Sequence, residues 1–273
     1  MKTDSFTSGS KYPEIRKYQA SNLKHLKGVR HAFFGRTGGV SEAPLDSLNL
    51  SKSSGDEDSY LLENRYRIAL EFDVGPESLL LGRQVHGNFV VTADEAWHRD
   101  APPIADGIVT NKPGLMLGVL TADCAPVLFY DPVAQAIGVA HCGWRGVLSR
   151  VLLKTVEAMQ GLGSKSENIV AAVGPSIAPN FFEVGPEVRA SYLESLPHTE
   201  VYFTPSERRG HYYCNLAGIV VNQLKILGLN KIQHLLLDTY RNDKSFYSCR
   251  RAKHREEGIF GNQVSAIMLK GSS

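Results

Sequence analysis

The sequence predicts a single α/β domain built on a mixed β-sheet flanked by helices, and three observations support that fold class. The 273 residues suffice for one large domain, and 42% hydrophobic with 21% charged residues is typical of a globular protein. Short apolar runs bounded by turn residues outnumber helical patterns in the middle of the chain. Helical and extended patterns alternate towards the C-terminus.

The first part of the chain is predicted to be an arm followed by a strand and a helix. Residues 1–28 begin with a polar stretch that lacks apolar periodicity, so we place the domain at residues 29–273. The apolar run at 29–34 predicts the first strand. Residues 58–72 carry apolar side chains at helical spacing and are followed by the terminating pair Gly75-Pro76.

The middle of the chain is predicted to be mostly sheet with one strong helix. Six short apolar runs predict strands at 79–81, 89–91, 108–110, 115–120, 127–130 and 137–140. Residues 147–160 carry an apolar stripe that predicts one continuous helix between Gly146 and Gly161.

The last part of the chain alternates predicted strands and helices. Strands are expected at 169–173, 232–237 and 264–269, and helices at 186–193 and 216–227. The basic run at 250–255 favours a solvent-exposed loop, with a phosphate site as the alternative.

Composition excludes several classes of protein. Thirty basic and 28 acidic residues give a net charge of +2, too little for a protein that coats nucleic acid. Four cysteines without a CxxC pair indicate neither a disulfide scaffold nor a zinc ribbon. The N-terminus lacks a signal-peptide core, and no apolar stretch is long enough for a membrane span. We therefore expect a cytoplasmic protein without nucleic-acid or membrane partners. For its oligomeric state, a monomer is favoured.

The most informative stretch is a predicted hairpin. If residues 131–134 form its loop, Tyr130 pairs with Gln135, and the antiparallel ladder then places Cys124 opposite His141, with Cβ atoms about 5 Å apart. A one-residue slip would break this inference. A thiolate and an imidazole at that separation can share a metal or act as nucleophile and base. The alternative is a buried cysteine beside a structural histidine.

A third candidate ligand is His86, which precedes Gly87 at a predicted strand end. A surface turn histidine is the alternative. Two histidines and one cysteine leave one tetrahedral position open, which is typical of catalytic zinc. Copper accepts the same donors, but the chain has no His-x-His pair and no evident axial methionine after His141, so zinc is favoured.

Four further residues suit a polar or anionic substrate. Arg145 precedes the predicted helix at 147–160, where helix amides favour an anion. Arg36 lies in a glycine-rich turn that is either a second anion site or a plain β-turn. Asp106 and Asp123 are candidates for proton transfer, although such aspartates often serve as turn caps or orient metal ligands.

Nine short motifs in this order make the chain resemble the laccase-domain, or YfiH-type, family over roughly residues 29–269. They are Arg36-Thr37-Gly38-Gly39-Val40-Ser41, Ser47-Leu48-Asn49-Leu50, Asn64-Arg65, Gln84-Val85-His86-Gly87, Ala105-Asp106-Gly107, Thr121-Ala122-Asp123-Cys124, His141-Cys142-Gly143-Trp144-Arg145-Gly146, Gly174-Pro175 and Phe182-Glu183-Val184-Gly185.

The resemblance implies a fold shared with the catalytic domain of the toxin cytotoxic necrotizing factor, and zinc bound by His86, Cys124 and His141. It also implies phosphorolysis of adenosine, inosine and methylthioadenosine, with adenosine deamination as a second activity. Copper-dependent polyphenol oxidation and editing of peptidoglycan precursors have been attached to the same family. Within the matching motifs we assign Asn49 and Gln84, with Arg36 and Arg145, to binding of nucleoside and phosphate.

The leading hypothesis is therefore a zinc-dependent purine nucleoside phosphorylase with adenosine deaminase activity, in which Cys124, His141, Asp123 and Asp106 form the catalytic group. The alternatives are an amide or muropeptide hydrolase with Cys124 as nucleophile and His141 as base, a copper-dependent polyphenol oxidase, and a metal-binding regulatory module without catalytic activity.

Overall fold

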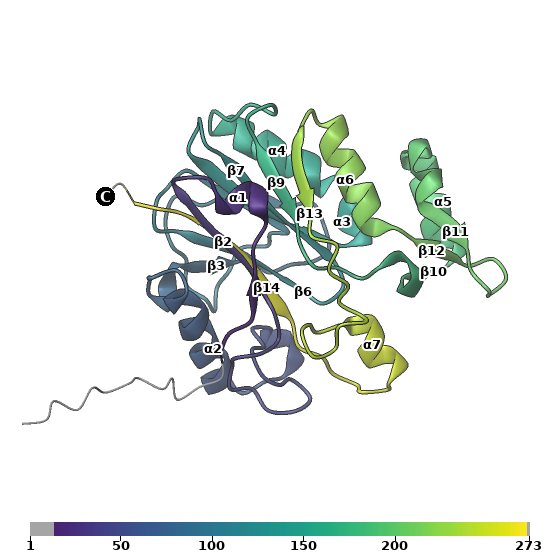
Figure 1. Ribbon diagram of the computed structural model, residues 1–273, viewed down its shortest axis with the longest axis horizontal. Coiled ribbons are helices and arrows are strands. Elements are labelled where there is room, and N and C mark those ends of the chain that lie inside the picture. Colours follow the sequence, from purple (N-terminus) through teal and green to yellow (C-terminus); the bar gives the residue numbers. More distant parts are fainter. Residues whose placement is uncertain (1–13, 272–273) are drawn as a thin grey trace, which may run out of the picture.

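Two large β-sheets pack face to face, and helices cover both outer faces in the computed structural model, which describes residues 14–271 (Figure 1). The five-stranded sheet has the order β1-β2-β14-β6-β3. Its strands are β1 (Lys17–Tyr18), β2 (Val29–Phe34), β14 (Gln263–Leu269), β6 (Met116–Thr121) and β3 (Leu79–Leu81). All its neighbours are antiparallel except β3 and β6, which are parallel.

The six-stranded sheet has the order β13-β9-β7-β8-β5-β4 and contains the predicted hairpin at its centre. Its strands are β13 (Lys231–His234), β9 (Val170–Val173), β7 (Ala125–Asp131), β8 (Ala136–Cys142), β5 (Gly107–Thr110) and β4 (Val90–Thr92). Every residue of β7 and β8 is buried, because one face meets the other sheet and the opposite face is covered by helices.

The remaining elements are seven helices, four 3-10 turns and a small third sheet among the described residues. The helices are α1 (Ser21–Lys24), α2 (Asp58–Leu70), α3 (Trp144–Leu148), α4 (Val151–Gly161), α5 (Pro186–Ser195), α6 (Leu216–Ile226) and α7 (Cys249–His254). The 3-10 turns are η1 (Lys52–Ser54), η2 (Pro76–Ser78), η3 (Pro179–Phe181) and η4 (Pro197–Tyr202), and the small sheet comprises β10 (Glu183–Val184), β12 (Tyr212–Cys214) and β11 (Phe203–Pro205).

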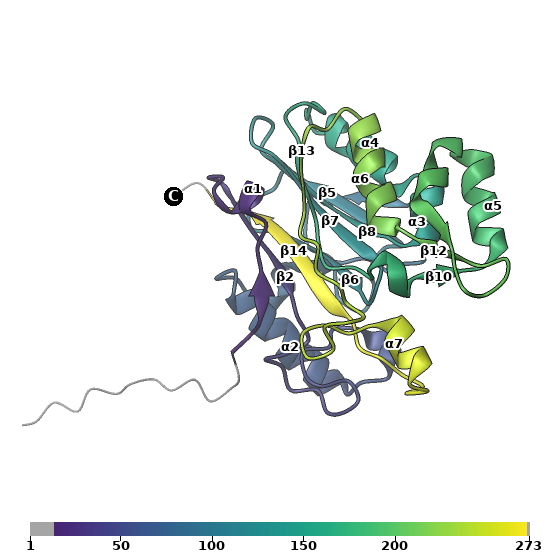
Figure 2. The same cartoon turned by 45° about the vertical axis from the view of Figure 1, so that its right-hand side comes forward.

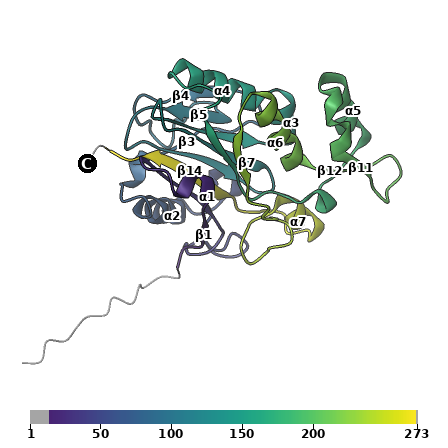
Figure 3. The ribbon, with the colours of Figure 1, turned by 45° about the horizontal axis from the view of Figure 1, so that its top comes forward.

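Three hydrophobic layers hold the sheets and helices together. Between the sheets, Phe33 and Ile267 of the five-stranded sheet belong to one buried cluster with Leu128 and Val139 of the six-stranded sheet. The outer face of the five-stranded sheet packs against α2, and that of the six-stranded sheet packs against α4 and α6 (Figures 2 and 3). Within residues 14–271, none of the helices combines the length and apolarity that a membrane span requires.

The predicted α/β class is confirmed, and the predicted single mixed sheet is in fact two packed sheets. The predicted strand at 29–34 coincides with β2, and that at 79–81 with β3. The expected start of order at residue 29 is too late, because β1 already pairs with β2 and α1 packs on it. Residues 1–13 of the predicted arm lie outside the described residues.

Two predictions about helices are wrong. The continuous helix at 147–160 is split into α3 and α4 by Arg150, which has the left-handed φ of 69°. Asn88 Nδ2 donates to the Ser149 carbonyl at 2.6 Å, so a side chain takes the place of a helical donor at the break. The basic run predicted as a loop forms α7, whose first turn is capped by Ser248 Oγ.

The hairpin register is also wrong, by two residues. Asp131 is the last residue of β7 and pairs with Ala136, because its Oδ1 accepts hydrogen bonds from Val133 N at 2.8 Å and Ala134 N at 3.0 Å. His141 consequently pairs with Pro126 rather than with Cys124. An offset of two residues preserves the alternation of faces, so Cys124 still lies on the side of the hairpin that carries His141.

Candidate metal centre and its cavity

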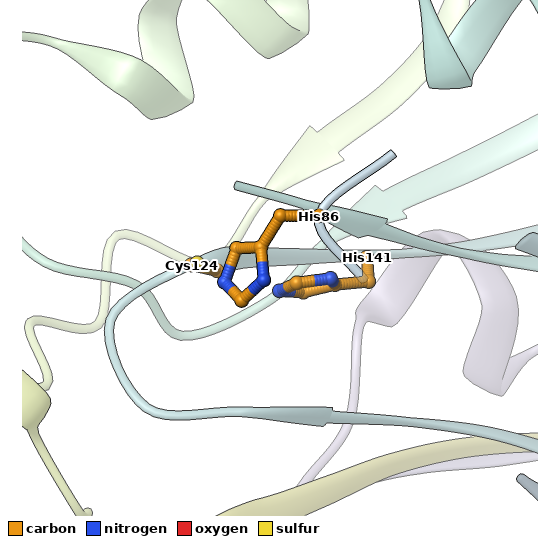
Figure 4. Close-up of side chains that lie close together, drawn as sticks. All are labelled: His86, Cys124 and His141. Atoms are coloured by element: carbon orange, nitrogen blue, oxygen red, sulfur yellow. The ribbon is translucent and has the colours of Figure 1, made fainter. Parts of the chain in front are cut away.

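His86, Cys124 and His141 converge at one point, with their ligand atoms all within 4.8 Å of one another (Figure 4). His86 lies in the loop after β3, Cys124 in the bend between β6 and β7, and His141 in β8. The two imidazole rings are nearly perpendicular, with centroids 4.7 Å apart. Among residues 14–271, this is the only cluster of three or more potential metal-ligating side chains.

A glycine leaves the room that the three ligands occupy. A Cβ atom at Gly143 would lie 2.9 Å from His86 Cδ2 and 3.1 Å from Cys124 Sγ. Contacts this short require a shift of the ligand side chains. The absence of a side chain at Gly143 therefore permits the ligand atoms to meet.

Asp106 holds both histidines in place. Its carboxylate accepts hydrogen bonds from His141 Nδ1 at 2.8 Å and from the backbone amides of His86 at 3.0 Å, Gly87 at 2.8 Å and Val85 at 3.2 Å. Burial alone would raise the pKa of Asp106, but these hydrogen bonds outweigh burial and lower it. The bond to Nδ1 leaves Nε2 of His141 available for a metal, as is usual for metal-binding histidines.

The ligands also influence the protonation of one another. Burial opposes ionisation of Cys124, yet contact with His141 and His86 lowers the pKa of its thiol to about 6. Burial opposes protonation of His141, but Cys124 and Asp106 raise its pKa to about 9. Without a metal, the thiolate and the imidazolium stabilise each other, and a metal cation would replace the proton between them.

The residues fit a tetrahedral metal ion with one open position. Thiolate and imidazole are soft and borderline ligands, and the oriented second nitrogen of His141 completes a typical metal-binding arrangement. His86, Cys124 and His141 all line the adjoining cavity, so a metal ion held by them would be accessible from it.

The cavity has a volume of about 870 Å³ and combines cations with aromatic rings near the three ligands. The Arg145 guanidinium lies 4.3 Å from the ring centre of Trp144, and that of Arg250 lies 5.4 Å from that of Phe182. No carboxylate lies within ion-pair distance of either arginine in the described part of the chain. Arg250 Nη1 donates to the Phe181 carbonyl at 3.4 Å, and the other donors of the two guanidinium groups remain available for an anionic ligand.

Comparisons with known proteins identify the family of the chain. The family model described as multi-copper polyphenol oxidoreductase laccase matches residues 30–270. The chain belongs to this family. A Deinococcus radiodurans protein named purine nucleoside phosphorylase is 37% identical over 241 residues, which is 88% of each chain. A Streptomyces griseus protein named purine nucleoside phosphorylase ORF3 is 42% identical over 176 residues, 64% of this chain and 72% of that one.

Solved structures of similar proteins share the whole fold. A Neisseria meningitidis protein is 29% identical and superposes with a TM-score of 0.83 over 94% of this chain and 99% of its own. YlmD from Geobacillus stearothermophilus is 26% identical and superposes with a TM-score of 0.82 over 92% of this chain and 94% of its own. This member of the laccase family therefore keeps the family fold from end to end of the matched region.

Asp123, the residue before Cys124, is engaged in structural hydrogen bonds in this family member. Its carboxylate accepts from Thr239 Oγ1 at 2.7 Å and from the backbone amide of Arg250 at 2.7 Å. Burial raises the pKa of Asp123, and the hydrogen bonds from Arg250, Ser248 and Thr239 only partly offset it. Asp123 therefore fastens the start of α7 to the loop that carries Cys124.

Three residues predicted to bind substrate have other partners. Arg36 donates from Nε to the Asp46 carbonyl at 2.7 Å and does not line the cavity. Asn49 is buried and donates to Asp56 Oδ2 at 2.8 Å, also away from the cavity wall. Gln84 lines the cavity, but its amide both donates to and accepts from the backbone of Leu120, at 2.8 and 2.7 Å. Arg145 is the predicted residue whose polar group remains free to bind.

Several cavity residues were missed by sequence reasoning. Arg250 and Lys253 lie in the basic run for which a solvent-exposed loop was favoured over a phosphate site, and their helical spacing was the available signal. Phe182 precedes Glu183 in a recognised motif but carried no chemical signature of its own. Its role as part of the cavity wall depends on a contact between segments far apart in the sequence.

Proposed function

We propose that this chain is a zinc-dependent purine nucleoside phosphorylase that acts on adenosine, inosine and methylthioadenosine, with adenosine deamination as a side activity. The observation that carries the proposal is the His86, Cys124 and His141 centre at the wall of a cavity with unpaired arginines and aromatic rings. The names of the Deinococcus and Streptomyces relatives support the same activity.

The donor set favours zinc over copper for this reaction. Two imidazoles and one thiolate around one open position are typical of catalytic zinc, and the described residues provide one such centre rather than the several that multicopper chemistry requires. When bound, the zinc ion would supply Lewis-acid chemistry at its open position.

The surrounding side chains suit the two substrates. Arg145 and Arg250 are placed to hold phosphate, and Trp144 and Phe182 offer flat apolar surfaces for a purine. In phosphorolysis, a phosphate oxygen bonds to the anomeric carbon as the bond to the purine nitrogen breaks, and the released base takes up a proton. In deamination, water adds to the ring carbon that bears the amino group, and ammonia leaves.

The test is product analysis with zinc-loaded protein and adenosine, with and without phosphate. We expect phosphate-dependent release of adenine, and slower formation of inosine that does not need phosphate. His86→Ala and Cys124→Ala should abolish both products. His198→Ala is the matched control, because His198 is exposed and lies outside the cavity wall. Full activity of Cys124→Ala would refute the proposed site.

A second candidate is hydrolysis of an amide or muropeptide by Cys124, with His141 as base. The direct contact between the thiol and the imidazole, with Asp106 behind the imidazole, favours it. Chelation separates the two functions. Nucleoside turnover should disappear with the metal, whereas a cysteine hydrolase should keep its activity and lose it on alkylation of Cys124.

A further inference from the structure

The cavity extends beyond the metal centre to a second group of cations, which we call the distal cluster and define as Lys52, Arg65, Arg83 and Arg99. These side chains come from η1, from α2 and from the loops after β3 and β4. Arg65 on α2 and Arg145 on α3 line the same cavity, although the two helices lie on opposite sides of the paired sheets (Figure 1). The cavity therefore extends from the three-ligand cluster to the distal cluster.

Arg65 is a buried cation that forms no ion pair. It is only 9% exposed, and its guanidinium donates to the carbonyls of Pro76, at 2.8 Å from Nε, and of Leu79. No carboxylate lies within ion-pair distance of it in residues 14–271, and Glu77 acts on it only at longer range. Burial and the nearby Arg99 lower the pKa of Arg65 to about 10, so it stays charged at neutral pH. A buried charge of this kind is costly unless an anion compensates it.

Arg83 presents a free guanidinium on a fixed backbone. Its amide donates to the Pro103 carbonyl at 2.8 Å, and its carbonyl accepts from Ala105 N at 3.2 Å. The side chain is exposed and has no hydrogen bond or ion pair in the described part of the chain. A rigid main chain with an unengaged guanidinium is well suited to binding an oxyanion.

The other members of the distal cluster are only partly neutralised. Asp100 is the one carboxylate among the distal lining residues, and it pairs with Lys52 at 2.9 Å and with Arg99 at 3.7 Å. Arg99 also pairs with Asp58 of α2. Beside them Trp97 lines the cavity with its Nε1 held by the Leu81 carbonyl at 3.0 Å. The distal end thus keeps a positive excess next to a fixed aromatic ring.

We propose that the distal cluster is a second anion subsite, and that the cavity takes a nucleoside carrying its own phosphate ester, with the phosphate at Arg65 and Arg83 and the reacting part at the metal end. The proposal rests on the proposed function for the nucleoside part of this ligand. It adds that phosphorylated nucleosides bind more tightly than unmodified ones. The volume of about 870 Å³ lies near the upper end of the range for small-molecule sites, as a ligand of this length requires.

Titration calorimetry of the zinc-loaded full chain tests the subsite without depending on turnover. The probes are adenosine, adenosine 5′-monophosphate, adenosine 5′-diphosphate and inorganic phosphate alone. We expect at least one nucleotide to bind roughly tenfold or more tightly than adenosine, since a charge-assisted pair is expected to contribute that much. In Arg83→Gln the ratio of the adenosine dissociation constant to the nucleotide dissociation constant should fall towards one. Arg209→Gln, at an exposed arginine outside the cavity wall, should keep the wild-type ratio.

The remaining outcomes separate failure of the subsite from failure of the proposed function. Equal binding of adenosine and both nucleotides would refute the distal subsite. Arg83-dependent binding of inorganic phosphate, without any nucleotide preference, would make the subsite one for free phosphate. Absence of binding by all four probes would also refute the distal subsite. Tighter binding of nucleotides without turnover of nucleosides would support the subsite and refute the proposed function. Turnover of adenosine without tighter binding of nucleotides would refute the subsite and support the proposed function.

Discussion

At the scale of single residues, the clustering of His86, Cys124 and His141 depends on the absence of a side chain at Gly143. Replacing Gly143 with alanine would bring a Cβ within about 3 Å of His86 and Cys124, so the two ligands must move apart. We expect Gly143→Ala to weaken zinc binding roughly tenfold or more, measured by competition with a chelating dye. Gly161→Ala is the control, because a Cβ at Gly161 meets nothing within 4 Å. Unchanged zinc affinity in Gly143→Ala would show that the ligands are less constrained than the contacts indicate.

Asp106 is expected to act through the histidines that it orients. Asp106→Asn weakens the acceptor for His141 Nδ1 and for three backbone amides, so we expect zinc affinity to fall by roughly 10 to 100 fold. Asp131→Asn is a matched control, because Asp131 is equally buried and accepts backbone amides away from the centre. Circular dichroism should show both variants folded. A comparable loss of zinc affinity in both would indicate a general structural effect.

His31 gives the protein a pH dependence unrelated to the site. It is buried, its Nε2 accepts from the amide of Ala20 at 2.9 Å, and burial lowers its pKa to about 4. Between that value and the ordinary pKa near 6.5 the unfolded chain binds the additional proton. The free energy of unfolding should therefore fall by up to roughly 3 kcal/mol as pH drops through this window. Urea unfolding of wild type and His31→Gln at several pH values should show a shallower dependence in the variant.

At the scale of elements, the sequence predicted that Cys124 and His141 would lie together although the hairpin register was two residues off. Cys124 and His141 stayed on one side of the hairpin because side chains alternate with a period of two. The register itself depended on Asp131, whose hydrogen bonds to Val133 and Ala134 fix where the loop begins. The periodicity of apolar residues in a sequence carries no information about such local side-chain hydrogen bonds. The same limit explains α7, where a Ser248 cap starts a helix inside a charged run.

The break between α3 and α4 carries a measurable conformational cost. Arg150 adopts φ 69° and ψ 40°, a left-handed conformation that costs an L-residue roughly 1 to 2 kcal/mol. Its side chain is exposed, so Arg150→Gly should raise the free energy of unfolding by roughly 0.5 to 1 kcal/mol after the entropy of glycine is counted. Arg150→Val should lower it, because a β-branched residue is strained there. Urea unfolding of the three proteins tests the order, and a more stable valine variant would contradict it.

At the scale of the whole molecule, the cavity could not be predicted from the sequence. Its wall combines η1, α2, α3, α7 and the ends of β3, β6 and β8, which meet only because two sheets pack face to face. Arg83 carries no local pattern that distinguishes it from a surface arginine, and the motif Asn64-Arg65 does not by itself assign Arg65 to a cavity. Only the structure shows that Arg65 is buried without an ion pair and that the guanidinium of Arg83 is free.

The metal centre should also contribute to the stability of the entire fold, because its ligands connect the two sheets. His86 follows β3 of the five-stranded sheet, His141 belongs to β8 of the six-stranded sheet, and Cys124 lies in the chain that passes between them. Zinc at about 100 times its Kd should stabilise the folded state by roughly 2.7 kcal/mol and raise Tm by about 5 to 10 °C. Cys124→Ser should abolish the zinc-dependent shift, whereas Cys249→Ser should keep it, because Cys249 is outside the three-ligand cluster. A Tm insensitive to zinc and to chelator would mean that these three side chains bind no metal that the fold depends on.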